Sequence, residues 1–399
     1  MNASIRNTVY GRAAPGDFLY LLAFGFYLFF AILQSTFYRN ILPQENRMNA
    51  VLFILLIALA LREFAFEVYN PRDFLLLFAA VLISVNALIS STFYLAFPFL
   101  LIYFGRSVSP RLLFTFAAWL TFILLIFIII SSYTGLIPNY VRHEMKRKTD
   151  REFLGFLFAL YPGAFFFNGA ALLLAVRGRR IRLITLAIVM AANTWLYLKT
   201  DGRLSFILTA LLIAAFAVAK LAPGFIRRLR PLFFVAVPAF PVCAVVSLIL
   251  TYRYNSSIPW MRKLNKMLGR RLFHGRTSLN RFGAGLFGRE VRWVGYGLNE
   301  HGHRSGARYL YVDNLYVNFL QRFGWIALIL ALVLLTWAIF RIYRARRYEL
   351  LIIFLLLALH SLIDDRILYL SYNTFWIAAV HALNRGYAQK EEWDYESIA

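Results

Sequence analysis

Long apolar runs dominate the chain and decide its class. Residues 112–132 read LLFTFAAWLTFILLIFIIISS, and residues 367–383 read ILYLSYNTFWIAAVHAL. A helix of about 20 apolar residues crosses the ~30 Å hydrocarbon core of a bilayer, so these runs are long enough to span it. Hydrophobic residues make up 61% of the sequence, against roughly 45–50% in a soluble domain. The alternating segments that a membrane barrel needs are absent. The sequence therefore predicts an all-α polytopic membrane protein.

We expect about twelve transmembrane helices in a single integral membrane domain that comprises residues 1–399. The fourth is short, and it could merge with a neighbour or re-enter the membrane. The predicted spans lie near residues 18–37, 49–62, 74–90, 92–105, 112–132, 153–176, 181–198, 204–220, 232–252, 323–340, 349–363 and 367–384.

Lysine and arginine in the short loops predict the orientation, because these residues favour the cytoplasmic side. With both termini inside, the inner side collects twenty Lys/Arg and the short outer loops hold five. We therefore expect both termini to be cytoplasmic. Much of the formal net charge of +24 belongs to this bias, so we expect no nucleic-acid partner.

Two longer loops break this bias, because the orientation places them outside. Residues 133–152 contain five Lys/Arg and three acids, and residues 253–312 contain twelve Lys/Arg and two acids, Glu290 and Glu300. Long loops are translocated largely regardless of charge, so the orientation stands. The positive charge either faces anionic headgroups and solvent or holds a polyanionic substrate. We favour the substrate and expect both loops to form part of an active-site cavity.

The motifs of common enzymes are missing. The sequence has no P-loop, no GxSxG and no HExxH. His301 and His303 form an HxH pattern without a cysteine or carboxylate cluster, so we predict no metal site. His303 is either a polar loop residue or a proton carrier. No DxD-type pair is present for the metal of a nucleotide-sugar enzyme, and we expect no cofactor.

Arginines at the predicted outer face are candidates for binding an anion. Arg203 begins an apolar run, where its guanidinium either reaches an aqueous cavity or snorkels from the helix end beside Asp201. Arg270, Arg271 and Arg276 lie within GRRLFHGR. Forked guanidinium groups suit phosphate oxygens, although one of these three could be only interfacial.

The stretch DNLYVNFLQRFGW, which begins at Asp313, holds the candidate base. Val312, Leu315, Tyr316 and Phe319 share one helical face by their spacing. Asp313 stands just before this run, so it is either the N-cap of the helix or a carboxylate that faces the cavity. A lone carboxylate beside many arginines should stay ionised, because nearby positive charge lowers its pKa.

In the order and spacing of three segments, the chain resembles the Wzy-type polysaccharide polymerases of the O-antigen polymerase/ligase superfamily. TDGRLSFILTAL (200–211) is similar to the family's outer-face arginine and following span. HGRTSLNRFGAGLFG and WVGYG (within 274–297) resemble its GR-containing loop, and VDNLYVNFLQRFGWIALIL (312–330) resembles the DN-containing start of its next span. The resemblance covers about 150 residues; the N-terminal spans match only in hydropathy and number.

Two positions refine the resemblance. Many relatives carry a tryptophan three or four residues after the GR, where this chain has Thr277 to Asn280, so Arg271 is an alternative to Arg276. The related ligases carry histidine where this chain has Asp313, which favours a polymerase.

The resemblance implies an enzyme at the outer face of the bacterial cytoplasmic (inner) membrane. Such an enzyme joins undecaprenyl-pyrophosphate-linked oligosaccharide repeats into an O-antigen, capsule or exopolysaccharide, by transferring the growing chain onto a new repeat. It is metal-independent, works among membrane lipids, and has a flippase and a chain-length regulator as partners.

The resemblance also suggests roles for residues. The pyrophosphate would lie against arginines, with Arg203 and Arg276 first, then Arg270, Arg271 and Arg142. The sugar would be handled by Asp313 as base, by Asn314 and Tyr316 as positioning groups and by His303 as proton carrier. Independently of the resemblance, the stacking chemistry of aromatic rings suggests that Trp293, Tyr296 and Tyr309 contact the sugar.

Other functions stay open from the sequence. A ligase of the same superfamily would move a finished glycan onto another acceptor. A transporter would place ionisable residues in mid-span, where this sequence suggests few. A membrane scaffold would carry no chemistry.

Overall fold

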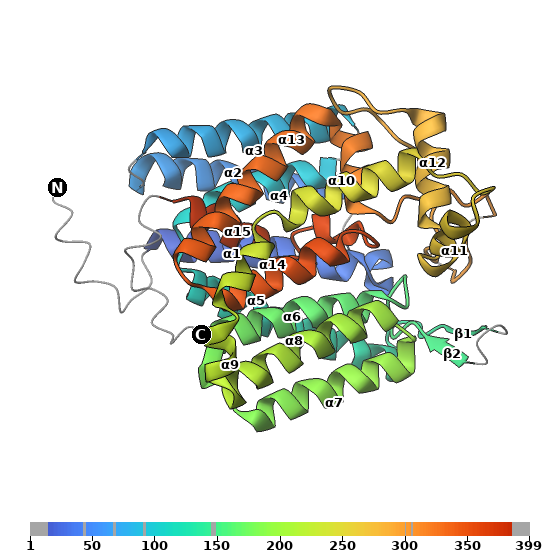
Figure 1. Cartoon of the computed structure of the whole chain (residues 1–399), viewed down its shortest axis with the longest axis horizontal. Coiled ribbons are helices and arrows are strands. Elements are labelled where there is room, and N and C mark those ends of the chain that lie inside the picture. Colours follow the sequence, from blue (N-terminus) through green and yellow to red (C-terminus); the bar gives the residue numbers. More distant parts are fainter. Residues whose placement is uncertain are drawn as a thin grey trace.

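The apolar runs form helices that lie side by side in a bundle (Figure 1). The computed structural model describes residues 15–384 except 43–44, 67–68, 91–92, 145–148, 300 and 305. The terminal segments that the charge bias places in the cytoplasm, and Glu300 of the basic loop, lie outside the described residues. A helix satisfies its backbone hydrogen bonds internally, which is why apolar runs adopt it in lipid.

The described helices follow one another with short connections. They are α1 (Pro15–Gln34), α2 (Glu45–Phe66), α3 (Pro71–Ile89), α4 (Phe93–Phe104), α5 (Pro110–Tyr133), α6 (Tyr161–Arg177), α7 (Leu183–Thr200), α8 (Arg203–Leu221), α9 (Pro223–Arg228), α10 (Ala239–Tyr252), α11 (Pro259–Met267), α12 (Arg271–Phe282), α13 (Leu315–Arg344), α14 (Tyr348–His360) and α15 (Phe375–Leu383).

Seven of the described helices are long and apolar enough to cross a membrane: α1, α2, α3, α5, α7, α8 and α13. The 3-10 helix η5 (Arg230–Ala236) and α10 meet at a bend of 46° and make an eighth if they are one span. The prediction of an all-α, multi-pass membrane protein is confirmed at this level, but twelve spans are not. The apolar segments near 92–105, 153–176, 349–363 and 367–384 contain α4, α6, α14 and α15, whose helices have only 12, 17, 13 and 9 residues.

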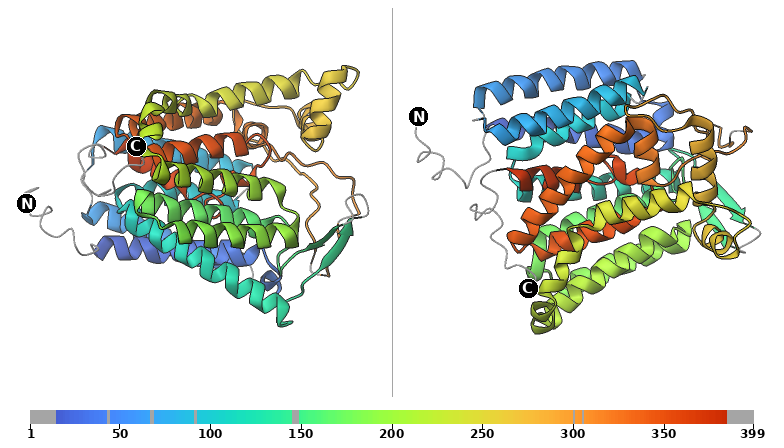
Figure 2. Two further views of the ribbon diagram at one scale, coloured as in Figure 1. Left: turned by 60° about the horizontal axis from the view of Figure 1, so that its bottom comes forward. Right: turned by 45° about the horizontal axis from the view of Figure 1, so that its top comes forward.

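The two predicted outer loops contain secondary structure of their own. Residues 253–312 include α11 and α12, and residues 133–152 include the antiparallel hairpin of β1 (Val141–Glu144) and β2 (Thr149–Glu152). All four elements lie at one end of the bundle, hereafter the α12 end (Figure 2). The two regions also meet, because Gly302 packs against the Tyr140 ring. Just after residues 133–152, the Leu157 carbonyl accepts from the Leu298 amide at 3.1 Å.

Helix α13 is two helical segments that join at Gly324. Its φ of 82° lies in the left-handed region, which favours glycine, and a Cβ there would lie 2.3 Å from the Leu286 carbonyl oxygen. The amides of Trp325 and Ile326 donate to the carbonyls of Gly285 and Leu286 at 3.0 and 3.2 Å. Residues 285–286 therefore cap the second segment, because the first amides of a helix have no partner within it.

A buried ion cluster lies at the other end of α3, hereafter the Arg106 cluster. Arg106, 2% exposed, pairs with Asp73 of α3 at 3.1 Å and with Glu63 of α2. Asn86, near the far end of α3, accepts from the Gly288 amide at 2.9 Å. At about 1.5 Å rise per residue, Asp73 and Asn86 are roughly 20 Å apart, so the Arg106 cluster is remote from the α12 end.

Candidate functional site

The start of α13 is capped by Asn314 rather than by Asp313. The Asn314 Oδ1 accepts from the Val317 amide at 3.1 Å and from the Ser247 hydroxyl at 2.9 Å. Its Nδ2 donates to the Leu362 carbonyl at 2.7 Å. The N-cap alternative for Asp313 is therefore wrong by one residue, and the Asp313 carboxylate is left for other contacts. Asn314 itself is 7% exposed and fixes the backbone rather than facing a substrate.

Asp313 lies beside Arg271 and under Tyr309. The Tyr309 hydroxyl donates to Asp313 Oδ2 at 3.1 Å. Arg271 is held by the backbone, since Nε donates to the Ile363 carbonyl at 2.7 Å and Nη1 to the Leu268 carbonyl at 3.0 Å. Burial raises the pKa of Asp313, and the neighbouring Arg271 offsets this only in part. The expectation that arginines would lower this pKa is therefore wrong, because desolvation outweighs them.

Two further carboxylates, in the sequence SLIDDR, lie next to Asp313. Asp364 forms a two-pronged pair with Arg366 at 3.0 and 3.1 Å, and His360 Nε2 is 3.3 Å from its Oδ2. Burial alone would raise the pKa of Asp364, but Arg366 and His360 outweigh it and hold this pKa well below its usual range.

Asp365 is held differently from Asp364. Its Oδ2 accepts from the Tyr311 hydroxyl at 2.7 Å and from Asn318 Nδ2 at 3.0 Å, and the residue is 3% exposed. Burial, together with the nearby Asp313 and Asp364 carboxylates, raises the pKa of Asp365 to about 7. Asp313 and Asp365 therefore interact as a pair, which titrates in coupled steps.

Together these residues form an acid–arginine cluster of three carboxylates and three guanidinium groups. Within the described residues, only one of the possible acid–arginine pairs is in direct contact. The remaining carboxylates and guanidinium groups are hydrogen-bonded instead to tyrosine hydroxyls, an asparagine amide and backbone carbonyls. The members are Asp313, Asp364, Asp365, Arg271, Arg322 and Arg366, with Asp364–Arg366 as the contacting pair.

An aromatic cover lies over the carboxylates. Residues Val294 and Leu310 form an isolated antiparallel bridge, with N–O distances of 2.9 and 3.1 Å. The two bridged segments bring Trp293 edge-on to Tyr311 at 5.6 Å, and Tyr296 stacks on Tyr309 at 4.2 Å. Tyr309, which bonds Asp313, is itself one of the aromatic residues predicted to contact sugar. The other two, Tyr296 and Trp293, pack against Tyr309 and against Tyr311, which bonds Asp365.

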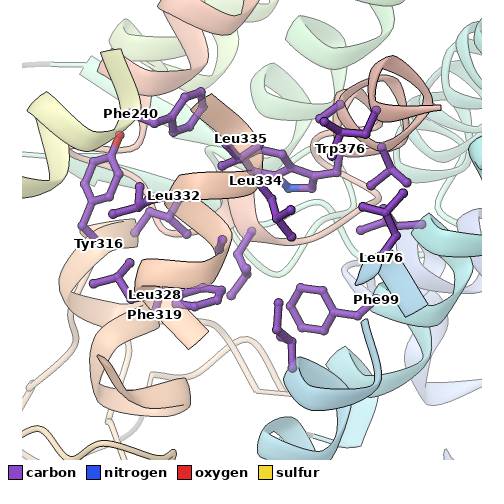
Figure 3. Close-up of a pocket in the computed structure, with 18 residues that line it drawn as sticks. Leu76, Phe99, Phe240, Tyr316, Phe319, Leu328, Leu332, Leu334, Leu335 and Trp376 are labelled. Carbon is purple, nitrogen blue, oxygen red and sulfur yellow. The ribbon is translucent and has the colours of Figure 1, made fainter. Parts of the chain in front are cut away.

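An apolar pocket lies along α13 (Figure 3). Its volume is about 150 Å³, and no charged residue lines it. Leu315, Tyr316 and Phe319 from the first turns of α13 form one part of the wall, and the pocket continues along the helix to Leu335. Side chains of α3, α4, α10 and α15 complete it, including Leu76, Phe99, Phe240 and Trp376.

Of the predicted pyrophosphate ligands, only Arg271 joins the acid–arginine cluster. Arg276 is half-buried on α12, and its side chain makes no hydrogen bond or ion pair among the described residues, so its guanidinium is available to a ligand. Arg270 is exposed and precedes α12 with a left-handed φ of 68°.

The other two predicted arginines lie elsewhere at the α12 end. Arg203 pairs with Asp201 at 3.1 Å, and Asp201 is also 3.5 Å from Arg151 of β2. This arrangement matches the snorkelling alternative for Arg203. Arg142 is exposed on β1, opposite Arg151. The structure does not bring either residue into contact with Asp313.

Tyr316 and His303 also differ from their predicted roles. Tyr316 is 2% exposed, and its hydroxyl donates to the Ala358 carbonyl at 2.9 Å, so it packs the helix against α14 and lines the pocket. His303 is exposed, and its backbone bonds Asn299. Among the described residues, no three His, Cys, Asp or Glu side chains converge as metal ligands.

Sequence reasoning missed Asp364, Asp365 and Arg322. A signal for the first two was present, because SLIDDR places three consecutive charges between two apolar runs, where a charge is costly unless it has a role. Comparison with family models, curated proteins and solved structures gives no match to this chain.

Proposed function

We propose that the protein polymerises undecaprenyl-pyrophosphate-linked oligosaccharide repeats into a surface polysaccharide by glycosyl transfer. The observation that carries the proposal is that a charged site and an apolar pocket share the first turns of α13. Asn318 and Arg322 belong to the charged side, whereas Leu315 and Phe319 line the pocket. A lipid-linked sugar has the same two halves, an anionic head and an apolar chain.

The chemistry follows from the unpaired members of the cluster. Asp313 takes the proton of the attacking sugar hydroxyl, and that oxygen forms a bond to the anomeric carbon of the donor. The bond between this carbon and the pyrophosphate oxygen breaks, and the lipid pyrophosphate leaves as an anion. A base whose pKa is raised toward the working pH suits the first step.

The leaving group needs positive charge that is already in place. Arg271 is fixed by two backbone carbonyls, so it can stabilise an anion without reorganising. Arg276 lies further along α12 with its guanidinium unengaged, and Arg270 precedes the helix. These three arginines are the proposed pyrophosphate ligands.

The proposal includes a location and a topology. We place the α12 end at the outer face of the bacterial cytoplasmic membrane, with both termini cytoplasmic and twelve apolar segments in or re-entering the membrane. The excess of Lys/Arg in the short loops of the opposite side supports this orientation. A flippase would supply the substrate, and a chain-length regulator would act on the product.

The direct test is polymerisation by the purified protein in lipid nanodiscs, given one defined lipid-linked oligosaccharide. We expect a ladder of products that a chelator does not remove. Transfer onto a different acceptor without a ladder would instead indicate a ligase. Movement of the lipid-linked sugar across vesicles without a new glycosidic bond would indicate a transporter.

A matched pair of variants on α12 tests the arginine role. Arg271→Gln should reduce transfer by about 10²–10³-fold, the usual effect of losing one electrostatic stabiliser of the transition state. Arg281→Gln is the control, since Arg281 is exposed on the same helix and only stacks on Phe282. Equal activity in the two variants would remove Arg271 from the mechanism.

A further inference from the structure

We propose that Arg322 binds a carboxylate on the sugar repeat, so that the substrate contains an acidic sugar. This inference rests on the proposed function and adds the chemical class of the repeat. Its starting point is a buried arginine whose charge has no carboxylate in contact with it.

Arg322 is 7% exposed and projects from α13 just before the bend at Gly324. Its Nε is buried without a hydrogen-bond partner, and Nη1 has only the Tyr369 hydroxyl, at 3.4 Å. No carboxylate lies within ion-pair distance in the described part of the chain. Burying a charge in this way is costly unless a partner completes it.

Other buried arginines show what a structural role requires. Arg106 contacts Asp73 and Glu63, and Arg62 lies 3.6 Å from Asp17. Arg366, which is only half-buried, binds Asp364 through two nitrogens. Each of these has its own carboxylate, so the lack of one at Arg322 points to a partner that the protein does not itself supply.

The surroundings of Arg322 fit a sugar. Its guanidinium carbon lies 4.8 Å from the centre of the Trp293 ring, and Trp293 meets Tyr311 edge-on. Tyr369 stacks on Tyr94 at 5.8 Å, and their hydroxyls are 3.0 Å apart. Aromatic faces and hydroxyl groups together provide stacking and hydrogen bonding for a pyranose ring.

A carboxylate fits this site better than a pyrophosphate does. One guanidinium matches one carboxylate in a two-pronged contact. A pyrophosphate carries several charges and is matched by several guanidinium groups, which the proposed ligands Arg270, Arg271 and Arg276 provide. Arg322 also lies one helical turn beyond Asn318, which binds Asp365, so a sugar held there has its neighbour close to Asp313 and Asp365.

Trp293 separates Arg322 from the outer surface. The indole is half-buried, and its Nε1 donates to the Ser278 hydroxyl at 2.8 Å. A sugar reaches the guanidinium when the Trp293 side chain moves aside. Gly295 and Gly297 follow this residue and lower the resistance of the local backbone to such a movement.

The first test identifies the substrate. Cells that lack this protein should accumulate a lipid-linked repeat, and its mass spectrum should show a sugar that bears a carboxylate. A neutral repeat, or one whose only anion besides the carrier is phosphate, would overturn the role of Arg322 while leaving the polymerase intact. No accumulated repeat at all would overturn the polymerase itself.

The second test uses the native repeat and the same repeat with its carboxyl group reduced to an alcohol. The unmodified protein should show at least a tenfold higher KM for the reduced repeat. Arg322→Gln should lose this discrimination and Arg322→Lys should keep part of it, while Arg344→Gln, an exposed control at the far end of α13, should behave as the unmodified protein. Discrimination that survives in Arg322→Gln would contradict the proposal.

Discussion

The molecule buries charges at two ends of its bundle and holds them in opposite ways. In the Arg106 cluster Arg106 contacts both Glu63 and Asp73, and outside it the buried Arg62 lies 3.6 Å from Asp17. In the acid–arginine cluster the numbers of acids and arginines are equal, but only Asp364 and Arg366 are in contact.

The difference indicates that the Arg106 cluster stabilises the fold, whereas the acid–arginine cluster is suited to binding a ligand. The Arg106 cluster joins α2 and α3 to η3 (Gly105–Ser107). His381 of α15 is also linked to it, because its Nδ1 lies 2.8 Å from the Arg106 carbonyl oxygen in a hydrogen bond. Charges that satisfy one another hold helices together but offer nothing to a ligand. Charges that are fixed by hydroxyls, amides and carbonyls keep their electrostatic potential for a substrate.

The largest expected effect comes from Asp313. Asp313→Asn removes the proposed base and should lower the rate of transfer by about 10²–10⁴-fold, with the melting temperature unchanged within a few degrees. Asp201→Asn is the control, because Asp201 binds Arg203 and Arg151 outside the cluster. Near-normal transfer by Asp313→Asn would mean that this carboxylate is not a base.

Disrupting the Arg106 cluster should lower the stability of the protein but leave the rate of transfer unchanged. Arg106→Met leaves two buried carboxylates without their cation, and removing one partner of a buried pair costs about 3–5 kcal/mol. Denaturant unfolding in detergent measures this loss. Transfer per folded molecule should stay normal, because the cluster is remote from Asp313. Normal stability together with lost transfer would show that the Arg106 cluster serves activity rather than stability, contrary to the proposal.

The coupled carboxylates should show in the pH profile. Transfer requires ionised Asp313, whose raised pKa moves the acid limb of the profile above the value of an ordinary aspartate, about 3.9. Asp365 has a pKa of about 7, raised by burial and by the Asp313 and Asp364 charges, so it is still protonated while Asp313 ionises. Asp365→Asn should therefore leave the acid limb in place. A limb that moves to lower pH in this variant would show that Asp365, and not Asp313, ionises first.

The smallest expected effect is the loss of the helix cap. Asn314→Ala removes the bonds to the Val317 amide, the Ser247 hydroxyl and the Leu362 carbonyl and should lower the free energy of unfolding by about 1–3 kcal/mol. Asn314→Asp keeps the acceptor for the Val317 amide but sets an oxygen against the Leu362 carbonyl, so it should recover little of the loss. If Asn314→Ala lowered the rate of transfer far more than its loss of stability explains, Asn314 would have a role in positioning the substrate.

Hydropathy predicted where the helices lie but not how long they are. The apolar runs near 153–176 and 367–384 were expected to cross the membrane, yet α6 has 17 residues and α15 has 9. Turns and 3-10 segments such as η6 (Arg366–Leu368) interrupt these runs. An apolar run shows that residues avoid water, and this is equally true of a helix and of a buried turn.

The sequence predicted part of the site. Asp313 and Arg271 were found because one precedes a helical face and the other sits in an arginine-rich motif, and Trp293, Tyr296 and Tyr309 because aromatics suit sugars. Asp365 and Arg322 were not found. Their partners are 54 and 47 residues away in the chain, at Tyr311 and Tyr369, and no local pattern shows such contacts.

The bend at Gly324 has a consequence for engineering. The carbonyls of residues 285–286 cap the second segment of α13, so the basic region is hydrogen-bonded to the helix that follows it. The amide of Leu315, at the start of that helix, bonds the Ser361 carbonyl. A chimera that exchanged only residues 253–312 with a relative would separate a cap from its helix. Because Leu315 and Arg271 bond the carbonyls of Ser361 and Ile363, the smallest module that keeps these contacts runs from Arg253 to Ile363.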